Sequence, residues 1–525
     1  PRALRPLPVD SIAGVGARGA GILAGRFVLA GQAIAVRPLD AAARPPGARF
    51  VQRLDWAPAG ASAAWLAAFH GFGWLRDLAA VGSPEAQRLA RDLVCDWIIG
   101  HESWTPLAWA PEILGARLSA WVGHQAFLCE GADPAFRAQM FGSLARQSRH
   151  LARCLPSDVV GSDLLTAIKG LVLASLALPS GGDRAARGLA LLETEIKAQV
   201  LPDGGHVERS PAAQMEALRH LVDIRAALGT AGEEAPSALR TAIDRLAPML
   251  RFFRHGDGRL CLFNGTRAED AAQLDRLLAD ADARGKPPPQ APHSGFQRLQ
   301  SGRSVLLLDC GMIPRQGLDQ RTHAGSLSFE LSNGRDRVIV NCGAHLGASA
   351  TWRRVERATA AHSTLVVDDT NSAEVQAEGG IGRRPRLVVC QREQAEGCTW
   401  LDASHDGYRQ SHGLIHRRRL FLSSDGDDLR GEDILAGSGG RAYALRFHLH
   451  PSVQTTTTHG GKAVLMRAPS GAGWRFRAAD GTTEIADSIY LGDDGEPTKC
   501  RQVVVTGALR GSGARIRWAL QREGR

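Results

Sequence analysis

Residues able to move protons or bind anions gather in a few short polar segments of this 525-residue chain. The segment LPDGGHVERSP (residues 201–211) places His206, Glu208 and Arg209 within four positions, and its glycine pair permits a tight turn. Histidine, carboxylate and arginine are residue types that acid–base catalysis uses. We therefore predict a candidate catalytic loop here, while the same pattern also fits an ordinary polar connection with a helix cap.

Two further histidines precede predicted strands and are candidates for a metal site. His323 stands before the run SLSFELS, and His362 stands before LVVDD. Two ligands are too few for zinc, which takes four protein ligands in structural sites and three plus water in catalytic sites. Asn341, Cys342 and His345 are candidates for a third ligand, although an amide oxygen suits zinc poorly. No cofactor is certain, and a zinc site in the β region stays open.

The elements that must position these residues change character along the chain. From about residue 60 to 255, apolar residues recur at helical spacing in segments separated by Pro, Gly, Ser or Asp. Ser83 followed by Pro84 predicts one helix start, because a hydroxyl cap and a proline at the first helical position satisfy otherwise unpartnered amides. Roughly eight helices with short connections predict helix pairs arranged as a toroid or a stacked array.

A proline-rich segment, residues 281–295, separates this region from a second one with a different period. Beyond it, short apolar runs alternate with polar residues at a period of two and are separated by Asn-Gly, Asp-Gly and Ser-Gly turns. Such runs are typical of a large antiparallel β-sandwich. We predict a multidomain α + β protein with a helical domain over residues 1–285 and a β-sandwich domain over residues 296–525.

The amino-acid composition limits the classes of molecule that the protein is expected to bind. The net charge of +9 could attract an anionic polymer, but no block of five or six like charges is present, so we expect no nucleic acid partner. Only five of the 63 basic residues are lysines, a bias that genome base composition explains more simply than ligand choice. Only three tyrosines are present, and all lie beyond residue 400.

The cysteines and the apolar runs bear on the compartment. Nine scattered cysteines without a C-x-x-C spacing argue against a disulfide framework and against a zinc ribbon. No segment is as long and apolar as a membrane-spanning helix, and no signal peptide is visible. We expect a protein of the cytoplasm or the periplasm, without a membrane span.

Several segments together resemble one known family. The runs HAGSLSFELSNGRDRVIVNCG (323–343) and RATAAHSTLVVDD (357–369) resemble the β-domain signature of heparinase II/III-like polysaccharide lyases. LPDGGHVERSP (201–211) resembles the catalytic loop of their helical domain. WAPEILGARLSAWVGH (109–124) and FFRHGDGRLCLFNG (252–265) resemble further segments of bacterial members. The resemblance covers most of the chain, with its segments in the expected order.

This resemblance implies an incomplete α/α toroid followed by a two-layered β super-sandwich. It also implies β-elimination in uronic-acid-containing polysaccharides. That reaction needs a base for the proton beside the uronate carboxylate, an acid for the departing oxygen, and a group that neutralises the carboxylate. The implied partner is an acidic polysaccharide or oligosaccharide, and a homodimer is an assembly that the sequence allows.

By resemblance, three groups of residues acquire expected roles. The expected catalytic residues are His206, His323, Glu208 and Arg209. The expected substrate-binding residues are Arg321, Trp109, Arg117, Trp121, His255 and Asn264. The positions that bind zinc in some members are occupied by His323, Asn341 and His362. Core packing is the alternative role of the tryptophans.

The chain also departs from the family pattern. Many members carry a tyrosine shortly after the D-G-G-H-x-E-R-S-P stretch, where this chain has Ala212, Ala213 and Gln214. Arg321 replaces the first histidine of an H-x-H-x-D pattern and Gly325 replaces its aspartate. Either the proton transfers are reassigned, with a histidine base and a histidine acid, or the protein no longer catalyses them.

Three hypotheses about function follow. The first is a polysaccharide lyase acting on an acidic polysaccharide or oligosaccharide. The second is a non-catalytic protein that binds acidic glycans or takes part in envelope-polysaccharide assembly on the lyase fold. The third is a glycoside hydrolase, which needs a second carboxylate near Glu208, with Asp203 and Asp257 as the candidates.

Overall fold

The computed structural model describes residues 3–8, 12–36, 54–347, 349–458, 461–493, 497–509, 511 and 513–524. The outer limits of the two predicted domains, residues 1 and 525, lie outside the described residues. The chain divides into two compact units. The helical unit comprises residues 1–199, 216–243 and 346–348, and the β unit comprises residues 200–215, 244–345 and 349–525.

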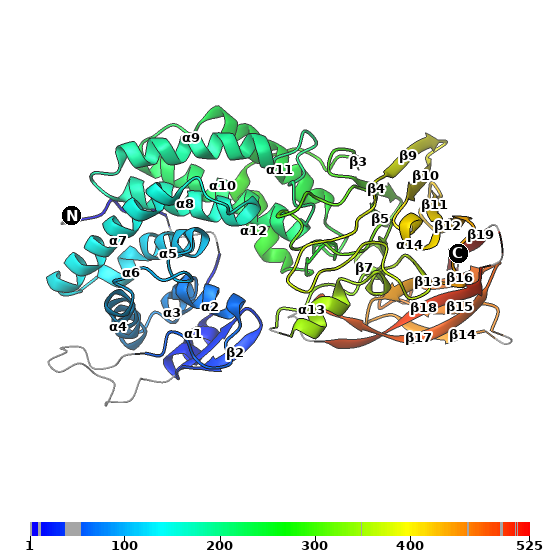
Figure 1. The fold of residues 1–525 in the computed structure, drawn as a ribbon, viewed down its shortest axis with the longest axis horizontal. Coiled ribbons are helices and arrows are strands. Elements are labelled where there is room, and N and C mark those ends of the chain that lie inside the picture. The colour runs from blue at the N-terminus through cyan, green and yellow to red at the C-terminus, as the bar shows by residue number, and fades with distance from the viewer. Residues whose placement is uncertain are drawn as a thin grey trace. The chain divides into compact units, whose positions relative to one another are not determined.

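Helices dominate the first half of the chain (Figure 1). They are α1 (Gly16–Leu23), α2 (Ala63–His70), α3 (Leu75–Val81), α4 (Pro84–Gly100), α5 (Pro111–Gly123), α6 (Gln125–Cys129), α7 (Pro134–Cys154), α8 (Gly161–Ala177), α9 (Gly182–Gln199), α10 (Pro211–Ala231), α11 (Ser237–Phe252) and α12 (Ala271–Ala281). A two-stranded sheet of β1 (Arg26–Leu29) and β2 (Gln32–Ala35) belongs to the helical unit.

Local sequence explains the helix ends and their packing. The predicted start of α4 is confirmed, because Ser83 Oγ accepts a hydrogen bond from Ala86 N at 3.2 Å and Pro84 is the first helical residue. Helices α5 and α8 lie side by side, where Gly115 and Gly170 bring the two backbones together. A Cβ atom at Gly170 would lie 2.2 Å from Gly115 O, so only glycine permits this approach.

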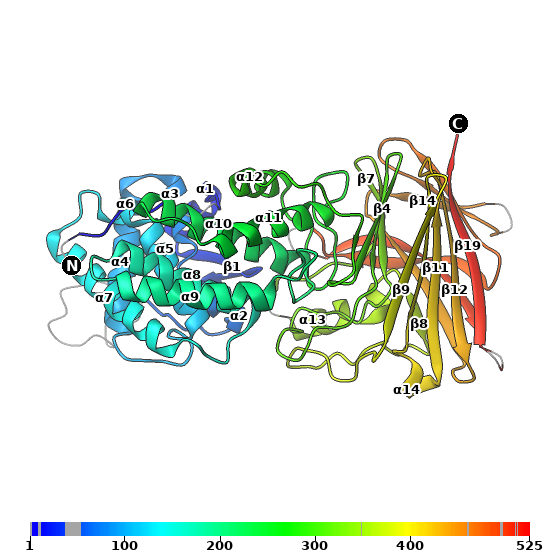
Figure 2. The same ribbon diagram turned by 90° about the horizontal axis from the view of Figure 1, so that it is seen from above.

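Two antiparallel sheets form the body of the β unit. The eight-stranded sheet has the order β14 (Gln454–Thr457), β15 (Val464–Arg467), β16 (Gly473–Ala478), β19 (Gly513–Glu523), β12 (Asp428–Gly437), β11 (Leu414–Leu422), β10 (Cys398–His405), β9 (Val388–Ala395). Strands β9, β11, β12 and β19 of this sheet are seen running along one another in Figure 2. The other sheet has the order β17 (Thr482–Tyr490), β18 (Thr498–Ala508), β13 (Ala442–Leu449), β7 (Asp336–Val340), β6 (Phe329–Asn333), β5 (Ser304–Asp309), β4 (Phe296–Ser301), β3 (Gln290–Ala291), and β8 (Leu365–Val367) pairs with β13.

The two sheets share one apolar core, to which both contribute alternate residues. Phe329 from β6, Phe447 from β13 and Trp518 from β19 pack together there, with the rings of Phe329 and Trp518 stacked at 5.8 Å. Along β11, buried residues alternate with more exposed ones. This alternation is the period of two that predicted a sandwich, and it confirms the predicted fold class of helices followed by antiparallel β structure.

The chain changes from helices to strands at one place, and the boundary between its two compact units lies at another. Helix α12 ends at Ala281 and strand β3 begins at Gln290, within the predicted boundary segment. The β unit nevertheless includes residues 200–215, which are the loop and the start of α10, and residues 244–281. It also holds the short helices α13 (Ala350–Glu356) and α14 (Arg409–His412). Among the described residues, no helix combines the length and apolar character that crossing a membrane requires.

A fully buried polar network lies inside the sandwich core. The Asp433 carboxylate accepts hydrogen bonds from Arg418 Nε at 2.8 Å, His416 Nε2 at 2.7 Å and Trp518 Nε1 at 2.9 Å. Arg418 Nη1 in turn donates to Leu327 O at 2.6 Å and to Ser363 O at 2.9 Å. The network therefore ties the eight-stranded sheet to the loops that carry the predicted β-domain histidines.

We expect Asp433→Asn to lower the free energy of unfolding by about 3 kcal/mol at neutral pH, because it leaves the Arg418 charge buried without a counterion. Burial raises the pKa of the Asp433 carboxyl, but Arg418 and His416 outweigh this and lower it to about 2. Since the folded-state pKa lies below the usual 3.8, the contribution is present above that value and is lost as the pH falls through about 2. Urea unfolding followed by tryptophan fluorescence measures both effects.

The matched control is Asp487→Asn, which removes an exposed carboxylate paired with Arg501. Its expected effect is below about 0.5 kcal/mol. Equal stability of the Asp433 and Asp487 variants at neutral pH would contradict the role given to the buried network.

Candidate functional site

The loop of residues 200–210 is held in shape by Gln214, one of the three residues in the region where a tyrosine is expected. Val200 and His206 form an isolated antiparallel bridge across the turn. Gln214, which is fully buried, accepts a hydrogen bond from His206 N at 2.7 Å through Oε1 and donates to Gly204 O at 2.8 Å through Nε2. Gln214 thus fixes the loop, and neither it nor Ala213 supplies a hydroxyl group for proton transfer.

Arg209 is committed to structural contacts. Its backbone has a left-handed φ of +54°, which is rare for a non-glycine residue. Its guanidinium forms an ion pair with Asp309. The Nε atom donates to Ser294 O at 2.6 Å and Nη1 donates to Met312 O at 2.9 Å. Since these contacts engage the guanidinium within a buried environment, Arg209 positions the loop and does not offer a free fork to a carboxylate.

Asn264 joins the loop to the segment that carries His323. Its Nδ2 atom donates to Arg209 O at 2.8 Å and to Asp309 Oδ2 at 3.3 Å. Its Oδ1 atom accepts from His323 N at 3.1 Å. Asn264 also has a left-handed backbone, with φ of +47°. Such strain is maintained only where the surrounding contacts require it, and it is frequent at functional sites.

His323 and His362 form a continuous chain of hydrogen bonds whose partners determine both ring tautomers. Ala358 O can only accept, so His362 Nδ1 donates to it at 2.8 Å. His362 Nε2 is then an acceptor, and His323 Nδ1 donates to it at 3.1 Å. Gly265 N donates to the remaining nitrogen, His323 Nε2, at 3.0 Å. All four ring nitrogens therefore take part in this chain of hydrogen bonds.

The surroundings keep these rings uncharged. Burial, followed by the nearby His362 and Arg357, holds the pKa of His323 well below its usual 6.5. Burial also lowers the pKa of His362 to about 4, although the bond to Ala358 opposes this shift. At neutral pH both imidazoles are therefore uncharged, and His323 has no nitrogen in this structure with which to protonate a leaving group.

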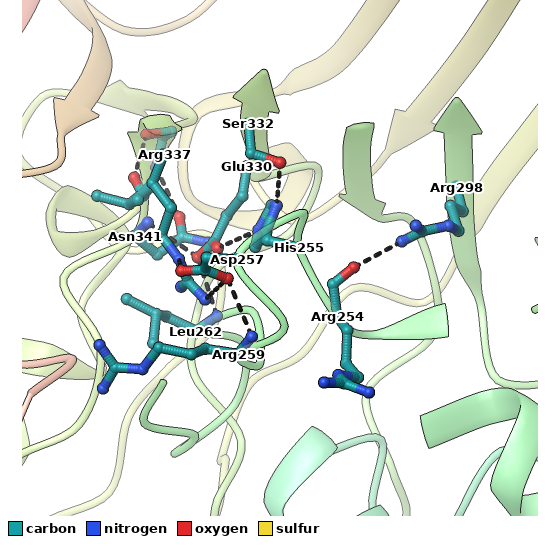
Figure 3. A network of polar contacts seen from close by, with 12 residues as sticks. Arg254, His255, Asp257, Arg259, Leu262, Arg298, Glu330, Ser332, Arg337 and Asn341 are labelled. Carbon is teal, nitrogen blue, oxygen red and sulfur yellow. Dashed lines mark hydrogen bonds and ion pairs between the residues drawn. The ribbon is translucent and has the colours of Figure 1, made fainter. Parts of the chain in front are cut away.

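Asn341, the third position of the expected zinc site, is bonded elsewhere (Figure 3). Its Nδ2 atom donates to Glu330 Oε1 at 3.1 Å, and its Oδ1 atom accepts from Ser363 N at 2.9 Å. Zinc needs the lone pairs of its ligands, and those of His323 and His362 already accept hydrogen bonds. Among the described residues, no group of three or more His, Cys, Asp or Glu side chains is arranged to hold a metal ion. The residues present therefore do not fit a zinc site.

Glu330, which sequence reasoning missed, is the centre of the network in Figure 3. Its carboxylate accepts from His255 Nε2 at 3.0 Å, Leu262 N at 3.0 Å and Asn341 N at 3.0 Å. Burial lowers the pKa of His255, and Ser332 Oγ lies 2.9 Å from its other nitrogen. The structure thus places His255, an expected substrate-binding residue, inside a buried network. A carboxylate in the apolar run SLSFELS was a signal that could have revealed it.

Arg321 is the predicted site cation that remains partly accessible. Its side chain is 30% exposed, and its Nε atom lies 3.7 Å from Glu208 Oε2. It packs against Gly265, where a Cβ atom would lie 3.2 Å from Arg321 Cβ. The structure therefore brings Glu208 and Arg321 together beside the Asn264 and His323 contacts, and Arg321 is the group best placed to meet an anion.

Three expected substrate-binding residues are in the core of the helical unit. Arg117 is fully buried, lies over the Trp97 ring at 3.9 Å, and donates to Gln147 Oε1 at 2.8 Å and His70 O at 3.0 Å. Trp121 is fully buried and contacts the same ring edge to face at 5.7 Å. Trp109 is 5% exposed and lies 6.5 Å from that ring. In this structure these side chains pack the unit and present no open ring face.

The chain is similar to known proteins over most of its length. Residues 283–519 match the family described as Heparinase II/III-like, C-terminal. The chain is 35% identical to FtsZ-localized protein C of Caulobacter vibrioides, in an alignment that covers 98% of this chain and 88% of that protein.

Solved structures show the same fold at low identity. Heparinase III matches with a TM-score of 0.73 and 15% identity, over 91% of this chain and 80% of that one. The heparan sulfate lyase HepC of Pedobacter heparinus matches with a TM-score of 0.63 and 16% identity, over 97% of this chain and 83% of that one. These matches confirm the predicted architecture of a helical toroid followed by a β-sandwich.

We expect the purified chain to keep its stability without zinc. Because the candidate ligands are hydrogen-bonded to one another, neither a chelator nor added zinc should move Tm by more than about 1 °C. Differential scanning fluorimetry and elemental analysis measure this. Stoichiometric zinc whose removal lowers Tm, and which is lost in His323→Ala, would contradict the hydrogen-bonded chain.

Proposed function

The chain belongs to the heparinase II/III-like family, and from this premise we propose that it binds a uronic-acid-containing polysaccharide or oligosaccharide without cleaving it. The family supplies the class of ligand. The absence of cleavage is inferred from the series of hydrogen bonds that runs from Gly265 through His323 and His362 to Ala358. This series uses both ring nitrogens of His323.

Several groups expected to serve β-elimination are missing from this site or engaged in other contacts. The reaction needs a base, an acid and a group that neutralises the uronate carboxylate. The sequence lacks the expected tyrosine, and Gln214 in that region holds the loop. His323 is neutral and occupied, and Arg209 is paired with Asp309. These facts support binding over catalysis.

Arg321 supports the proposed contact with an acidic sugar. Its guanidinium has a planar fork that matches a carboxylate, and its 3.7 Å separation from Glu208 is longer than a direct charge-assisted hydrogen bond. A uronate carboxylate can approach the exposed part of the Arg321 side chain, which is 30% of its surface. Electrostatic attraction from the net charge of +9 adds to the approach.

A glycoside hydrolase receives less support. The two carboxylates that could partner Glu208 have structural roles. Asp203 Oδ2 accepts from His293 N at 2.8 Å and Ser294 N at 2.7 Å. Asp257 pairs with Arg337 at 2.8 Å. Neither is placed as the second member of a catalytic carboxylate pair.

We expect saturable binding of heparan sulfate, alginate or another uronate polymer, with no rise in the ultraviolet absorbance that unsaturated uronate ends produce. Arg321→Ala should weaken binding about tenfold, because one charge-assisted contact is worth roughly 1.5 kcal/mol. Calorimetry and absorbance on the same samples measure both results.

Arg501→Ala is the matched control, since this exposed arginine pairs with Asp487 on the neighbouring strand. It should leave the affinity within about twofold, as expected for a weak exposed pair. A rise in absorbance that His206→Ala abolishes would show that the protein is a lyase and would overturn the non-catalytic proposal. No binding to any acidic polymer would overturn the proposed ligand.

A second candidate function rests on the relative at 35% identity. The name of that protein records that it is localized with FtsZ, and the alignment covers nearly the whole of both chains. By that likeness we propose that this chain associates with FtsZ polymers. Co-sedimentation with polymerised FtsZ tests the idea, and recovery of the chain in the supernatant at micromolar concentrations of both proteins would refute it.

A further inference from the structure

The outward face of the eight-stranded sheet carries two rows of side chains that cross neighbouring strands. The strand register aligns Trp400, Phe421 and Arg430 in one row, which continues to Ala519. It aligns Asp402, Arg419, Glu432 and Arg517 in the next row. Residues two apart on a strand point to the same face, about 7 Å from each other. The two rows therefore run parallel, one aromatic and one charged.

The aromatic row is open to solvent. Trp400 is 39% exposed, although large aromatic side chains are usually covered. Its ring centroid lies 5.1 Å from that of Phe421, and the Arg430 guanidinium lies 5.9 Å from the Phe421 ring on the other side. The small side chain of Ala519 ends the row. Trp400 and Phe421 thus form an apolar platform that a flat ligand can cover, with the Arg430 guanidinium beside it.

The charged row is a ladder of alternating sign. Arg419 bridges Asp402 at 3.0 Å and Glu432 at 3.3 Å. Arg517 pairs with Asp480 at 3.1 Å beyond the end of the row. These pairs hold the planar carboxylate and guanidinium groups in fixed positions, while the side chains of Arg419 and Arg517 remain 45% and 60% exposed. Fixed donors and acceptors thus lie along one side of the aromatic strip.

The two rows border a hollow of about 520 Å³, within the size range of small-molecule sites. Its lining comes from β9, β10, β11, β12 and β19, and Gln391 and Glu393 close one end. Gly431 lies in it opposite Trp518, where a Cβ atom would be 2.0 Å from the indole ring. That Cβ atom and the indole ring lie on the core side of the sheet, so glycine at this position serves the packing of Trp518 beneath the hollow.

The charges of the hollow indicate which ligand it suits. Three carboxylates and three guanidiniums line it: Glu393, Asp402, Glu432, Arg419, Arg430 and Arg517. Arg417 and Arg515, beside the hollow, also pair with Asp402 and Glu432. The lining itself has no excess of positive charge, which a polyanion needs. It is complementary to a ligand that has no charge and many hydroxyl groups, because each hydroxyl can donate to a carboxylate and accept from a guanidinium.

We propose that this hollow is a binding site for an uncharged oligosaccharide of pyranose units. The apolar face of one sugar ring lies on Trp400 and Phe421, and the hydroxyl groups along its edge bond with Asp402, Arg419 and Glu432. The site belongs entirely to the β unit and is separate from the loop residues Glu208 and Arg321. It would give the protein a second contact with a glycan, through neutral sugars.

Isothermal titration with cellohexaose and with the hexamer of N-acetylglucosamine tests this proposal on the full chain. We expect binding by at least one of them, with an affinity that hardly changes between low and high salt because the ligand is uncharged. Trp400→Ala should weaken binding about tenfold or more, as loss of an aromatic stacking contact does. Asp402→Asn, which keeps the side-chain shape, should weaken it less.

Ile415→Ala is the matched control, because Ile415 lies on the same face of β11 and is 36% exposed, outside the hollow. It should bind as the unchanged protein does, and so should Arg321→Ala, which separates this site from the proposed acidic-glycan site. Circular dichroism checks that each variant is folded. Failure of both hexamers to bind, or equal affinities for the unchanged protein and Trp400→Ala, would overturn the proposal. So would a dimer that Trp400→Ala converts to monomers, since a second copy would then occupy the hollow.

Discussion

The hydrogen-bonded chain from Gly265 through His323 and His362 to Ala358 is the interaction on which the interpretation of the site depends. It consists only of neutral groups, because burial makes charged imidazoles costly there. A closed set of donors and acceptors is stable without a metal ion. The same closure removes the free nitrogen that metal binding or proton transfer would need.

Buried ion pairs connect this chain to the rest of the β unit. Asp309 pairs with Arg209 and accepts from Asn264, which also holds His323 N. On the other side, Arg418 reaches from the Asp433 network to Ser363 O, next to His362. A buried charge is costly unless paired, so each pair constrains the loops that supply its partner. The family scaffold is thus retained, while its polar groups serve structure.

Sequence periodicity predicted the helices, the strands and the boundary between them, while the choice of a toroid over a stacked array came from the resemblance to the family. The caps at Ser83 and the alternation in β11 are local features, and local patterns report local structure. The site is different, because Arg209 and Asp309 are 100 positions apart. No pattern near Arg209 reveals that its guanidinium is already paired. Helical spacing likewise could not decide whether Trp109 and Trp121 line a binding surface or fill a core.

Two amide side chains, those of Gln214 and Asn341, lie in regions where the family pattern has other residue types. Gln214 is one of the residues in the region where many family members have a tyrosine, and it makes two hydrogen bonds to the loop and one to Leu246 O. Asn341 stands where a metal-binding aspartate is expected and bonds with Glu330, which an aspartate could approach only as a second buried negative charge. The amides of Gln214 and Asn341 each donate and accept hydrogen bonds at once, whereas a carboxylate can only accept.

The central claim is that His323 and His362 are neutral and share one proton-ordered chain. Nitrogen NMR of histidine-labelled protein at neutral pH measures the tautomer of each ring directly. The account predicts that both rings are uncharged and carry their proton on Nδ1, with no change when a chelator is added. A proton on Nε2 of His323, or a charged ring at either position, would contradict it.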